Sequence, residues 1–336
     1  MVTVRTRTLL KGAAAALAAA GCIAATAADW TPPPAQPIPA DNPTTAAKVE
    51  LGRRLFHETA LSIDRTLACA TCHQQSRAFS DGARTHVGVH GLAGRRNVMG
   101  LANVSLFGSL TWRDPVQVGL ERQVFVPLMG DDPIEMGMSG QEAVIVERLS
   151  TDACYPRQFL AAFPDDKGEI SSYAVARAIA AFERTLVSFD TPYDRYRRGD
   201  AAAISDPAKR GEARFAALGC ASCHAGPAFT DATGREVKAS FHSLGLGGAD
   251  QGLAEVTQDR RDRGRFRTPS LRNVALTAPY FHDGSAPTLA EAIRRHPGPA
   301  RKVAEPEMSD VVAFLTTLSD QGFVTDPRFS PPAPCR

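Results

Sequence analysis

Two short stretches of this chain of 336 residues carry its clearest chemistry. Residues 69–73 read CATCH and residues 220–224 read CASCH, and each is soon followed by Ala-Phe-Ser-Asp or Ala-Phe-Thr-Asp. Two thiols three positions apart can add to the two vinyl groups of a haem, and the adjacent histidine can then bind the iron. The repeat therefore predicts two covalently bound haem c groups, attached at Cys69, Cys72 and His73 and at Cys220, Cys223 and His224.

Two other chemistries use similar motifs. A structural zinc site needs four ligands in one cluster, and a thioredoxin-like dithiol does not need the histidine. Two complete copies in one chain favour haem over both. The two irons could serve only to pass electrons, which requires six ligands at each, or one of them could react with peroxide, which requires an open position.

Candidate sixth ligands for the second iron follow the second motif. They are His242, Tyr280, His282, His296 and Met308. Met308 lies on the apolar stripe of a terminal helix, where a role in the core is expected. His296 ends the helical stretch TLAEAIRR, and Pro297 stops that helix. From spacing alone, His296 could reach an iron or could be solvated beside Arg294 and Arg295.

The elements that must hold these motifs are helices joined by long loops. Apolar residues recur at helical spacing over residues 175–186 and 308–318, and helical stretches precede the motifs at residues 44–56 and 207–215. Ser139 with Glu142 and Thr288 with Glu291 have capping-box spacing. Long connections fill residues 82–140 and 243–269. We expect a mainly α fold with two cytochrome c-like haem domains and long loops.

The N-terminus has the features of a secretory signal. Arg5, Arg7 and Lys11 precede a small apolar run at residues 12–20. The alternative is a lipoprotein leader ending at residue 21, with a lipid on Cys22. No later stretch has the roughly 20 apolar residues of a membrane span. The expected organisation is a signal peptide at 1–27, a Pro-rich linker at 28–43, haem domains at 44–195 and 196–322, and a surface tail at 323–336. We therefore expect an exported, periplasmic protein.

The net charge and the remaining cysteines say little about the function. Lysine and arginine number 38 against 36 aspartate and glutamate residues, a formal net charge of +2. This balance gives no basic field for nucleic acid or an anionic membrane. Cys154 and Cys335 could pair in an oxidising compartment or remain two unpaired buried thiols.

Longer blocks of sequence resemble a known family. Residues 268–293, TPSLRNVALTAPYFHDGSAPTLAEAI, and residues 51–73, LGRRLFHETALSIDRTLACATCH, resemble the bacterial di-haem cytochrome c peroxidase and MauG family. The likeness covers roughly residues 42–320. Residues 95–112, RRNVMGLANVSLFGSLTW, also look like the subgroup associated with methanobactin and copper-protein operons. The resemblance implies that the N-terminal haem is the peroxidatic one and that the C-terminal haem transfers electrons.

The resemblance implies a ligand for the second iron. Its family ligand is Met in the peroxidases and Tyr in MauG, and here His296 stands at that place. An imidazole stabilises oxidised iron better than a thioether does, which fits storage of strongly oxidised states. His282 has no ligand role in the family and is interpreted as structural.

The resemblance also implies residues around the first haem. Trp112 matches the tryptophan between the haems, Gln123 the distal glutamine and Glu135 the distal acid. The spacing departs from the family by one residue before Gln123 and two before Glu135, so small insertions are required. We expect an open, five-coordinate first iron, with His90 or His86 as the alternative sixth ligand.

A calcium ion between the domains is the last implied group. Asn97 matches its side-chain ligand, and Thr277 and Pro279 match backbone carbonyl ligands. These are the hard oxygen donors that calcium prefers.

Three functions follow from the resemblance, all involving hydrogen peroxide except the last. The first is MauG-like oxidation of a side chain, such as tryptophan, in a copper-binding periplasmic partner. The second is a peroxidase that draws electrons from a small cytochrome or copper protein. The third is a non-catalytic electron carrier, against which Gln123 and Glu135 argue because a carrier needs no distal acid.

Overall fold

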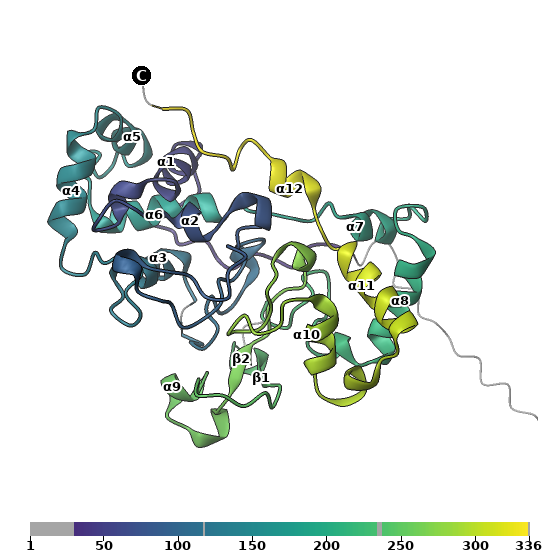
Figure 1. Ribbon diagram of the computed structural model, residues 1–336. Coiled ribbons are helices and arrows are strands. Elements are labelled where there is room, and N and C mark those ends of the chain that lie inside the picture. The colour runs from purple at the N-terminus through teal and green to yellow at the C-terminus, as the bar shows by residue number, and fades with distance from the viewer. Residues whose placement is uncertain (1–29, 117, 234–236, 335–336) are drawn as a thin grey trace, which may run out of the picture.

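The computed structural model describes residues 30–334, except residue 117 and residues 234–236. The described chain forms two lobes that lie side by side, and its last helix returns to the first lobe (Figure 1). The helices of the first lobe are α1 (Ala46–Phe56), α2 (Cys69–Cys72), α3 (Leu120–Met129), α4 (Glu142–Thr151), α5 (Tyr155–Ala162) and α6 (Ser172–Glu183). Those of the second are α7 (Pro192–Arg197), α8 (Asp206–Ala217), α9 (Ala254–Thr257), α10 (Leu289–Arg295) and α11 (Glu305–Thr316), and α12 (Gln321–Thr325) follows.

The expected mainly helical fold is confirmed. Within the described ranges, the strands β1 (Phe241–Ser243) and β2 (Arg265–Arg267) form a single antiparallel pair, with Phe241 opposite Arg267. None of the helices there is both long enough and apolar enough to cross a membrane. The stretches with apolar residues at helical spacing, 175–186 and 308–318, lie largely in α6 and α11. The helical stretches predicted before the two CxxCH motifs, 44–56 and 207–215, lie in α1 and α8.

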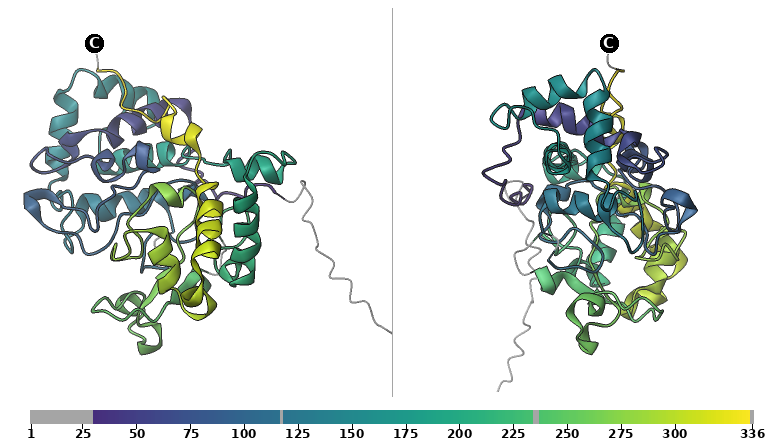
Figure 2. Two further views of the ribbon diagram at one scale, coloured as in Figure 1. Left: turned by 45° about the vertical axis from the view of Figure 1, so that its right-hand side comes forward. Right: turned by 90° about the vertical axis from the view of Figure 1, so that its left-hand side faces the viewer.

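Each lobe is built on one close helix crossing. A Cβ atom added to Gly52 of α1 would lie 1.9 Å from the carbonyl oxygen of Ala178 in α6. A Cβ atom added to Gly211 of α8 would lie 1.9 Å from the carbonyl oxygen of Asp310 in α11. Figure 2 shows α8 and α11 side by side in its left view. Glycine is therefore required at the same point of both crossings, because any larger residue would force the helices apart.

An aromatic pair follows the glycine in both lobes. Phe56 of α1 lies with its ring centre 5.2 Å from that of Phe182 in α6. Phe215 of α8 lies 5.3 Å from Phe314 of α11. All four phenylalanines are buried, and they form the centres of two separate hydrophobic cores. The two lobes thus share one packing scheme, as the repeated motif suggested.

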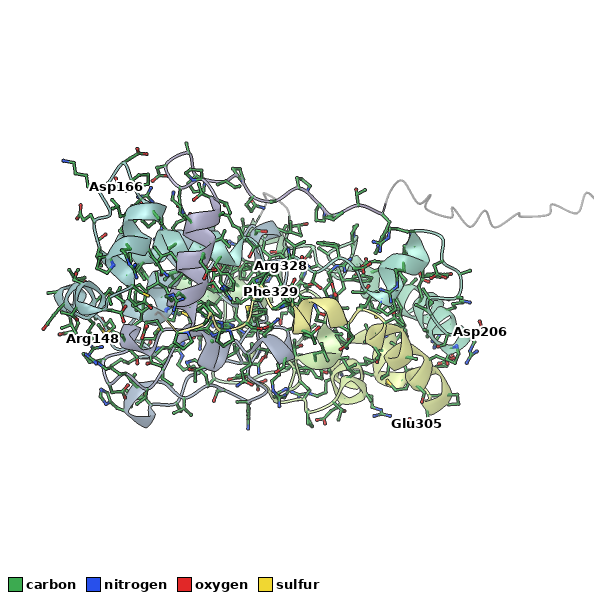
Figure 3. The ribbon with its side chains drawn as sticks, turned by 90° about the horizontal axis from the view of Figure 1, so that it is seen from above. Arg148, Asp166, Asp206, Glu305, Arg328 and Phe329 are labelled. Atoms are coloured by element: carbon green, nitrogen blue, oxygen red, sulfur yellow. The ribbon has the colours of Figure 1, made fainter. Side chains whose placement is uncertain are left out.

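The two ends of the described chain are packed more tightly than a linker and a tail would be. Trp30, in the Pro-rich segment, packs against Tyr193 of the second core, and its indole N–H donates to Asp194. The expectation of a surface tail after residue 322 is wrong for Phe323 and Phe329, which are each 4% exposed in the first core. Figure 3 shows Phe329 near the middle of the molecule. The apolar surface of these rings explains the difference.

A buried polar network joins the lobes. The sequences LANVSL (101–106) and LRNVAL (271–276) each place an asparagine in the left-handed region, with φ of 61° at Asn103 and at Asn273. Asn103 exchanges hydrogen bonds with the backbone of Ser188, and Asn273 donates to the Ser188 hydroxyl. Nearby, the fully buried pair Arg272–Asp194 is 2.7 Å apart. Each of these polar groups is satisfied, so the junction between the lobes is fixed in geometry.

One capping prediction is confirmed and one is wrong. The Thr288 hydroxyl accepts a hydrogen bond from the backbone N–H of Glu291 at the start of α10. Helix α4 is instead preceded by Gln141, and Ser139 does not cap it. The reason is a turn in which Gln141 N–H bonds to the Met138 carbonyl, with Gly140 at φ 67°.

Some predictions fall on residues that the structure does not describe. The signal peptide at 1–27, the lipid site at Cys22 and the thiol of Cys335 lie outside the described residues. Cys154 is disulfide-bonded. The four cysteines of the two CxxCH motifs are free for haem attachment.

Replacing Gly211 with alanine should destabilise the second lobe. The new methyl group would overlap the Asp310 carbonyl, and overpacking of this kind costs about 1–3 kcal/mol. The measurement is the free energy of unfolding in urea for the haem-loaded protein. Gly119→Ala is the control, because a Cβ there meets no heavy atom within 4 Å. Equal losses in the two variants would contradict the close-contact explanation.

Candidate haem sites and distal pocket

Each proximal histidine is oriented by a backbone carbonyl. The Nδ1 atom of His73 lies 2.8 Å from the Phe79 carbonyl oxygen, and that of His224 lies 3.2 Å from the Phe229 carbonyl oxygen. Because a carbonyl only accepts, Nδ1 carries the proton in both rings. The Nε2 atom is then left as the metal-binding nitrogen of a neutral imidazole.

His296 faces His224. It follows α10, and its Nδ1 atom lies 2.8 Å from the Ala292 carbonyl oxygen, which again leaves Nε2 unprotonated. The ring centres of His224 and His296 are 6.5 Å apart. With metal–imidazole bonds of about 2 Å, two rings on opposite sides of one iron need centres roughly 6 Å apart. The pair therefore fits a haem iron between its two rings.

Burial also keeps both rings in the form that binds metal. It lowers the pKa of His224 to about 4, with a further contribution from His296. Burial likewise lowers the pKa of His296 below its ordinary value. Both imidazoles are thus neutral at neutral pH, as ligation requires.

The other four candidates for the sixth position have different partners. Tyr280 donates its hydroxyl proton to the Val274 carbonyl, and burial raises its pKa to about 12. Met308 is 2% exposed and packs in the second core, as expected. His282 stacks on Phe266 with ring centres 3.6 Å apart. The fourth, His242, lies 2.6 Å from a carboxylate oxygen of Asp231.

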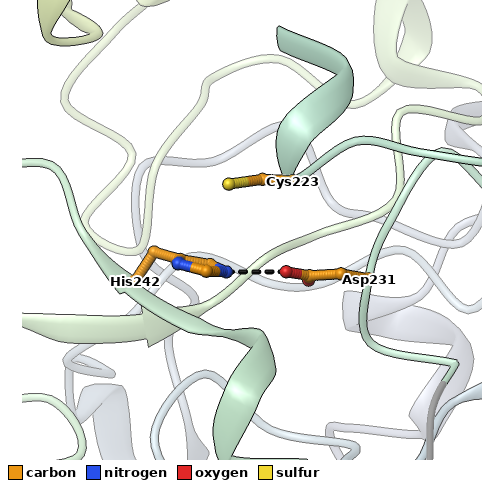
Figure 4. A group of neighbouring side chains, drawn as sticks. All are labelled: Cys223, Asp231 and His242. Carbon is orange, nitrogen blue, oxygen red and sulfur yellow. Dashed lines mark hydrogen bonds and ion pairs between the residues drawn. The ribbon is translucent and has the colours of Figure 1, made fainter. Parts of the chain in front are cut away.

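His242 and Asp231 form, with Cys223, a cluster that resembles a metal site (Figure 4). Over the described residues it is the one group of three histidine, cysteine or acidic side chains close enough to share an ion. Cys223 belongs to the haem motif, and a thioether sulfur cannot also act as a thiolate ligand. The two CxxCH pairs do not meet in one cluster, so the four-cysteine zinc alternative is excluded.

The space around His224 and His296 fits a haem. It is a cavity of about 710 Å³, within the roughly 300–1,000 Å³ typical of cofactor pockets. Arg267 lines it, is 3% exposed, and has two buried nitrogens, Nε and Nη1, without a hydrogen-bond partner. Burial lowers the pKa of Arg267 to about 10, and the charge of Asp231 opposes this shift only in part. The carboxylates of a haem would supply the missing charge, since a buried guanidinium requires an anion.

A cavity beside the first CxxCH motif contains a histidine that approaches an acid. A cavity of about 590 Å³ is lined by Cys72, Asp81, His86 and His90. His86 is buried, and its Nε2 atom lies 3.4 Å from a carboxylate oxygen of Glu135. His90, four residues further on, is exposed at φ 61°. Of the two histidines considered as ligands, His86 is thus the one that points inward.

Gln123 is not among the residues that line this cavity. It lies on α3, and its buried side-chain oxygen has no hydrogen-bond partner among the described residues. Burial raises the pKa of Glu135 above its ordinary value, whereas His86 opposes that shift. A protonatable acid of this kind can move a proton of a small polar substrate.

Sequence and structure comparisons identify the family. Residues 46–202 match the family described as di-haem cytochrome c peroxidase. The methylamine utilization protein MauG of Methylorubrum extorquens is 36% identical over 330 residues, which cover 93% of this chain and 90% of that protein. This chain belongs to the di-haem cytochrome c peroxidase family.

Two further relatives define the breadth of the family. Cytochrome c peroxidase Ccp of Escherichia coli is 37% identical over 292 residues, 85% of this chain, but the match spans only 61% of the E. coli protein. The crystal structure of a MauG-like protein associated with microbial copper homeostasis has a TM-score of 0.83 and 39% identity. The structural match covers 90% of this chain and 97% of the chain in that crystal structure. The predicted family is confirmed, and with it a peroxidase-type oxidoreductase that uses haem c.

The remaining site residues expected from the di-haem peroxidases lie at the junction of the lobes. The indole N–H of Trp112 donates to the Asn97 carbonyl at 2.8 Å, and the Trp112 carbonyl accepts from Arg267 N–H at 2.9 Å. Trp112 and Asn97 both line the second haem cavity, and so do Thr277 and Pro279. The structure therefore brings together the tryptophan and the three residues matched to calcium ligands.

Two features of the sites were not found from the sequence. Arg267 precedes the block that carries the family resemblance, but only its burial without a carboxylate partner reveals a role. The approach of His86 to Glu135 joins residues 49 positions apart. A single sequence carries no signal for such long-range pairs.

Replacing His296 with alanine should open the second iron site. We expect its ferric absorption and electron paramagnetic resonance signals to change from low-spin to high-spin, because one of the two facing imidazoles is lost. His242→Ala is the matched control, since His242 lines the same cavity but is bonded to Asp231. Unchanged spectra in His296→Ala, or an equal change in His242→Ala, would contradict ligation by His296.

Proposed function

We propose that this protein is a hydrogen-peroxide-dependent di-haem c oxidoreductase of the MauG type, which oxidises a side chain of a partner protein. The observation that carries this is an asymmetry between the two sites. A second imidazole faces His224, whereas the pair of His86 and Glu135 lies beside the first motif, where the charge of His86 acts on His73 and that of Glu135 acts on Cys72. The first iron is then the open, five-coordinate one, and the second is closed by His224 and His296.

The protein's own groups have distinct tasks in this proposal. A bound haem supplies an iron to which peroxide can bind and from which oxidising equivalents can be drawn. Glu135 takes a proton from the inner peroxide oxygen and delivers it to the outer one, which leaves as water. Gln123 orients the peroxide through its unpaired amide oxygen. Trp112, at the junction of the lobes, is the bridge between the two haems.

The choice of partner rests on two observations. Histidine rather than methionine at position 296 favours a low-potential second haem, which suits long-lived oxidised states rather than an electron reservoir. The MauG-like relative of known structure is associated with microbial copper homeostasis. We infer a copper-binding periplasmic protein as the partner, with tryptophan as the side chain oxidised, and no nucleic acid.

A second function has its own support. The E. coli relative is named a cytochrome c peroxidase, and a peroxidase would draw electrons from a small cytochrome or copper protein. The two functions differ in what happens to the partner. Peroxidase activity oxidises the partner's cofactor reversibly, whereas MauG-like activity leaves a covalent change in its mass. A plain electron carrier would show neither.

The deciding experiment mixes the haem-loaded protein with peroxide and then with a candidate partner. Mass spectrometry of a copper-binding partner should show oxidation of a tryptophan. Steady peroxide consumption supported by a reduced small cytochrome or copper protein, without covalent change, would establish the second function instead. No spectral response to peroxide would leave only the electron carrier.

Replacing Glu135 with glutamine should slow the reaction with peroxide. General acid–base groups contribute about 10²- to 10⁴-fold, so the rate constant of the peroxide-induced absorbance change should fall by that factor. Glu147→Gln, at an exposed position on α4, should leave the rate constant unaltered. A similar rate constant for Glu135→Gln and the wild type would remove the proposed role.

We propose that Asn97, Thr277 and Pro279 bind calcium between the lobes. The Asn97 amide nitrogen donates to the Ala83 carbonyl, which leaves its amide oxygen for a cation. Asn97→Ala should lower the calcium content measured by mass spectrometry of the metal, after dialysis. Equal calcium in the variant and the wild type, or none in either, would contradict this site.

A further inference from the structure

Two backbone segments are held together beside the first CxxCH motif. The N–H of Val89 donates to the Glu135 carbonyl, and the N–H of Gly94 donates to the His86 carbonyl, both at 2.8 Å. A Cβ atom on Gly88 would lie 2.3 Å from the Ile134 carbonyl oxygen. The loop that carries His86 therefore packs directly on the segment that carries Glu135.

The side chain of His86 has one close polar neighbour in this arrangement. Its Nε2 atom is buried, makes no hydrogen bond, and lies 3.4 Å from a Glu135 carboxylate oxygen. The ring rests on Gly94, where a Cβ atom would lie 2.2 Å from His86 Cε1. This contact leaves the imidazole little freedom to turn away from Glu135. His86 and Glu135 thus form a preorganised pair.

We propose that His86 is a positioning residue that acts through Glu135: the imidazole holds the carboxyl group in place and favours its ionised form. This rests on the proposed function, in which Glu135 must accept a proton from peroxide.

The charges around the pair are consistent with this role. Burial raises the pKa of Glu135, and the charge of His86 lowers it. The other titratable groups near the pair are His73, Asp64, Asp81, His90 and the thiols of Cys69 and Cys72, which become thioethers when haem is attached. A positive charge on His86 favours the carboxylate form of Glu135, in which it can act as a base. Without His86, burial alone acts on the carboxyl group and favours its protonated form.

The proposed proton transfer through Glu135 neither gains nor loses protons. One proton moves from the inner peroxide oxygen to Glu135 and then to the outer oxygen, which departs as water. The pair holds the same number of protons before and after this transfer. The electrons that reduce the O–O bond are those of the proposed function, and His86 takes no part in their transfer.

Infrared spectroscopy of the haem-loaded protein tests the pair directly. In a pH titration, the carboxylic acid C=O band of Glu135 should persist to higher pH in His86→Gln than in the wild type, and it should be absent from the double variant His86→Gln/Glu135→Gln. Arg84→Gln is the matched control, because it removes a positive charge from an exposed position two residues before His86. A band that disappears over the same pH range in His86→Gln and in the wild type would overturn the proposal.

The pH profile of the peroxide reaction gives a second readout. Glu135 must be ionised to accept the proton, so the rate constant falls as pH drops below its pKa. Loss of a neighbouring positive charge should move this acid limb upward by roughly one to three pH units in His86→Gln. The profile of Arg84→Gln should match the wild type. An unmoved acid limb in His86→Gln would contradict the proposal.

Two other outcomes are distinguishable. If the wild type does not react with peroxide, the proposed function fails, whereas the infrared measurement still tests the pair. If His86→Gln converts a low-spin first haem to high-spin, His86 is an iron ligand and not a partner of Glu135, which overturns the proposal while the second haem stays unchanged.

Discussion

The hydrogen bond from each proximal imidazole to a phenylalanine carbonyl is the interaction on which both sites depend. The two phenylalanines have positive φ angles, 64° at Phe79 and 50° at Phe229, which are uncommon for a large side chain. Such backbones persist only where the surroundings fix them. Phe79 packs against Phe56 and Phe323, and Phe229 packs against Phe314. The aromatic cores therefore set the orientation of the histidines.

The two sites hold their proximal histidines in the same way but differ in the other side chains around them. In the second lobe, a capped helix ends at His296 and presents a neutral imidazole at the distance of a second iron ligand. In the first lobe, two segments bring His86 and Glu135 together beside the first CxxCH motif. The same helix packing is thus combined with different side chains around the two proximal histidines.

Local features were the ones that the sequence allowed us to predict. The CxxCH motifs, the helices α6 and α11, and the cap at Thr288 all depend on residues a few positions apart. The cap at Ser139 failed because the turn at Gly140 competes with it. The docking of Trp30 and the unpaired charge of Arg267 depend on contacts that join distant segments. These contacts become visible only when the chain is folded.

The return of the chain to the first lobe has a consequence for biosynthesis. Phe323 and Phe329 touch Phe79, the residue whose carbonyl orients His73. Because a chain is synthesised from its N-terminus, the first CxxCH motif is made long before Phe323 and Phe329. The packing that fixes the Phe79 carbonyl, and through it the orientation of His73, is therefore completed only when the last helix has been made and docks on the first lobe.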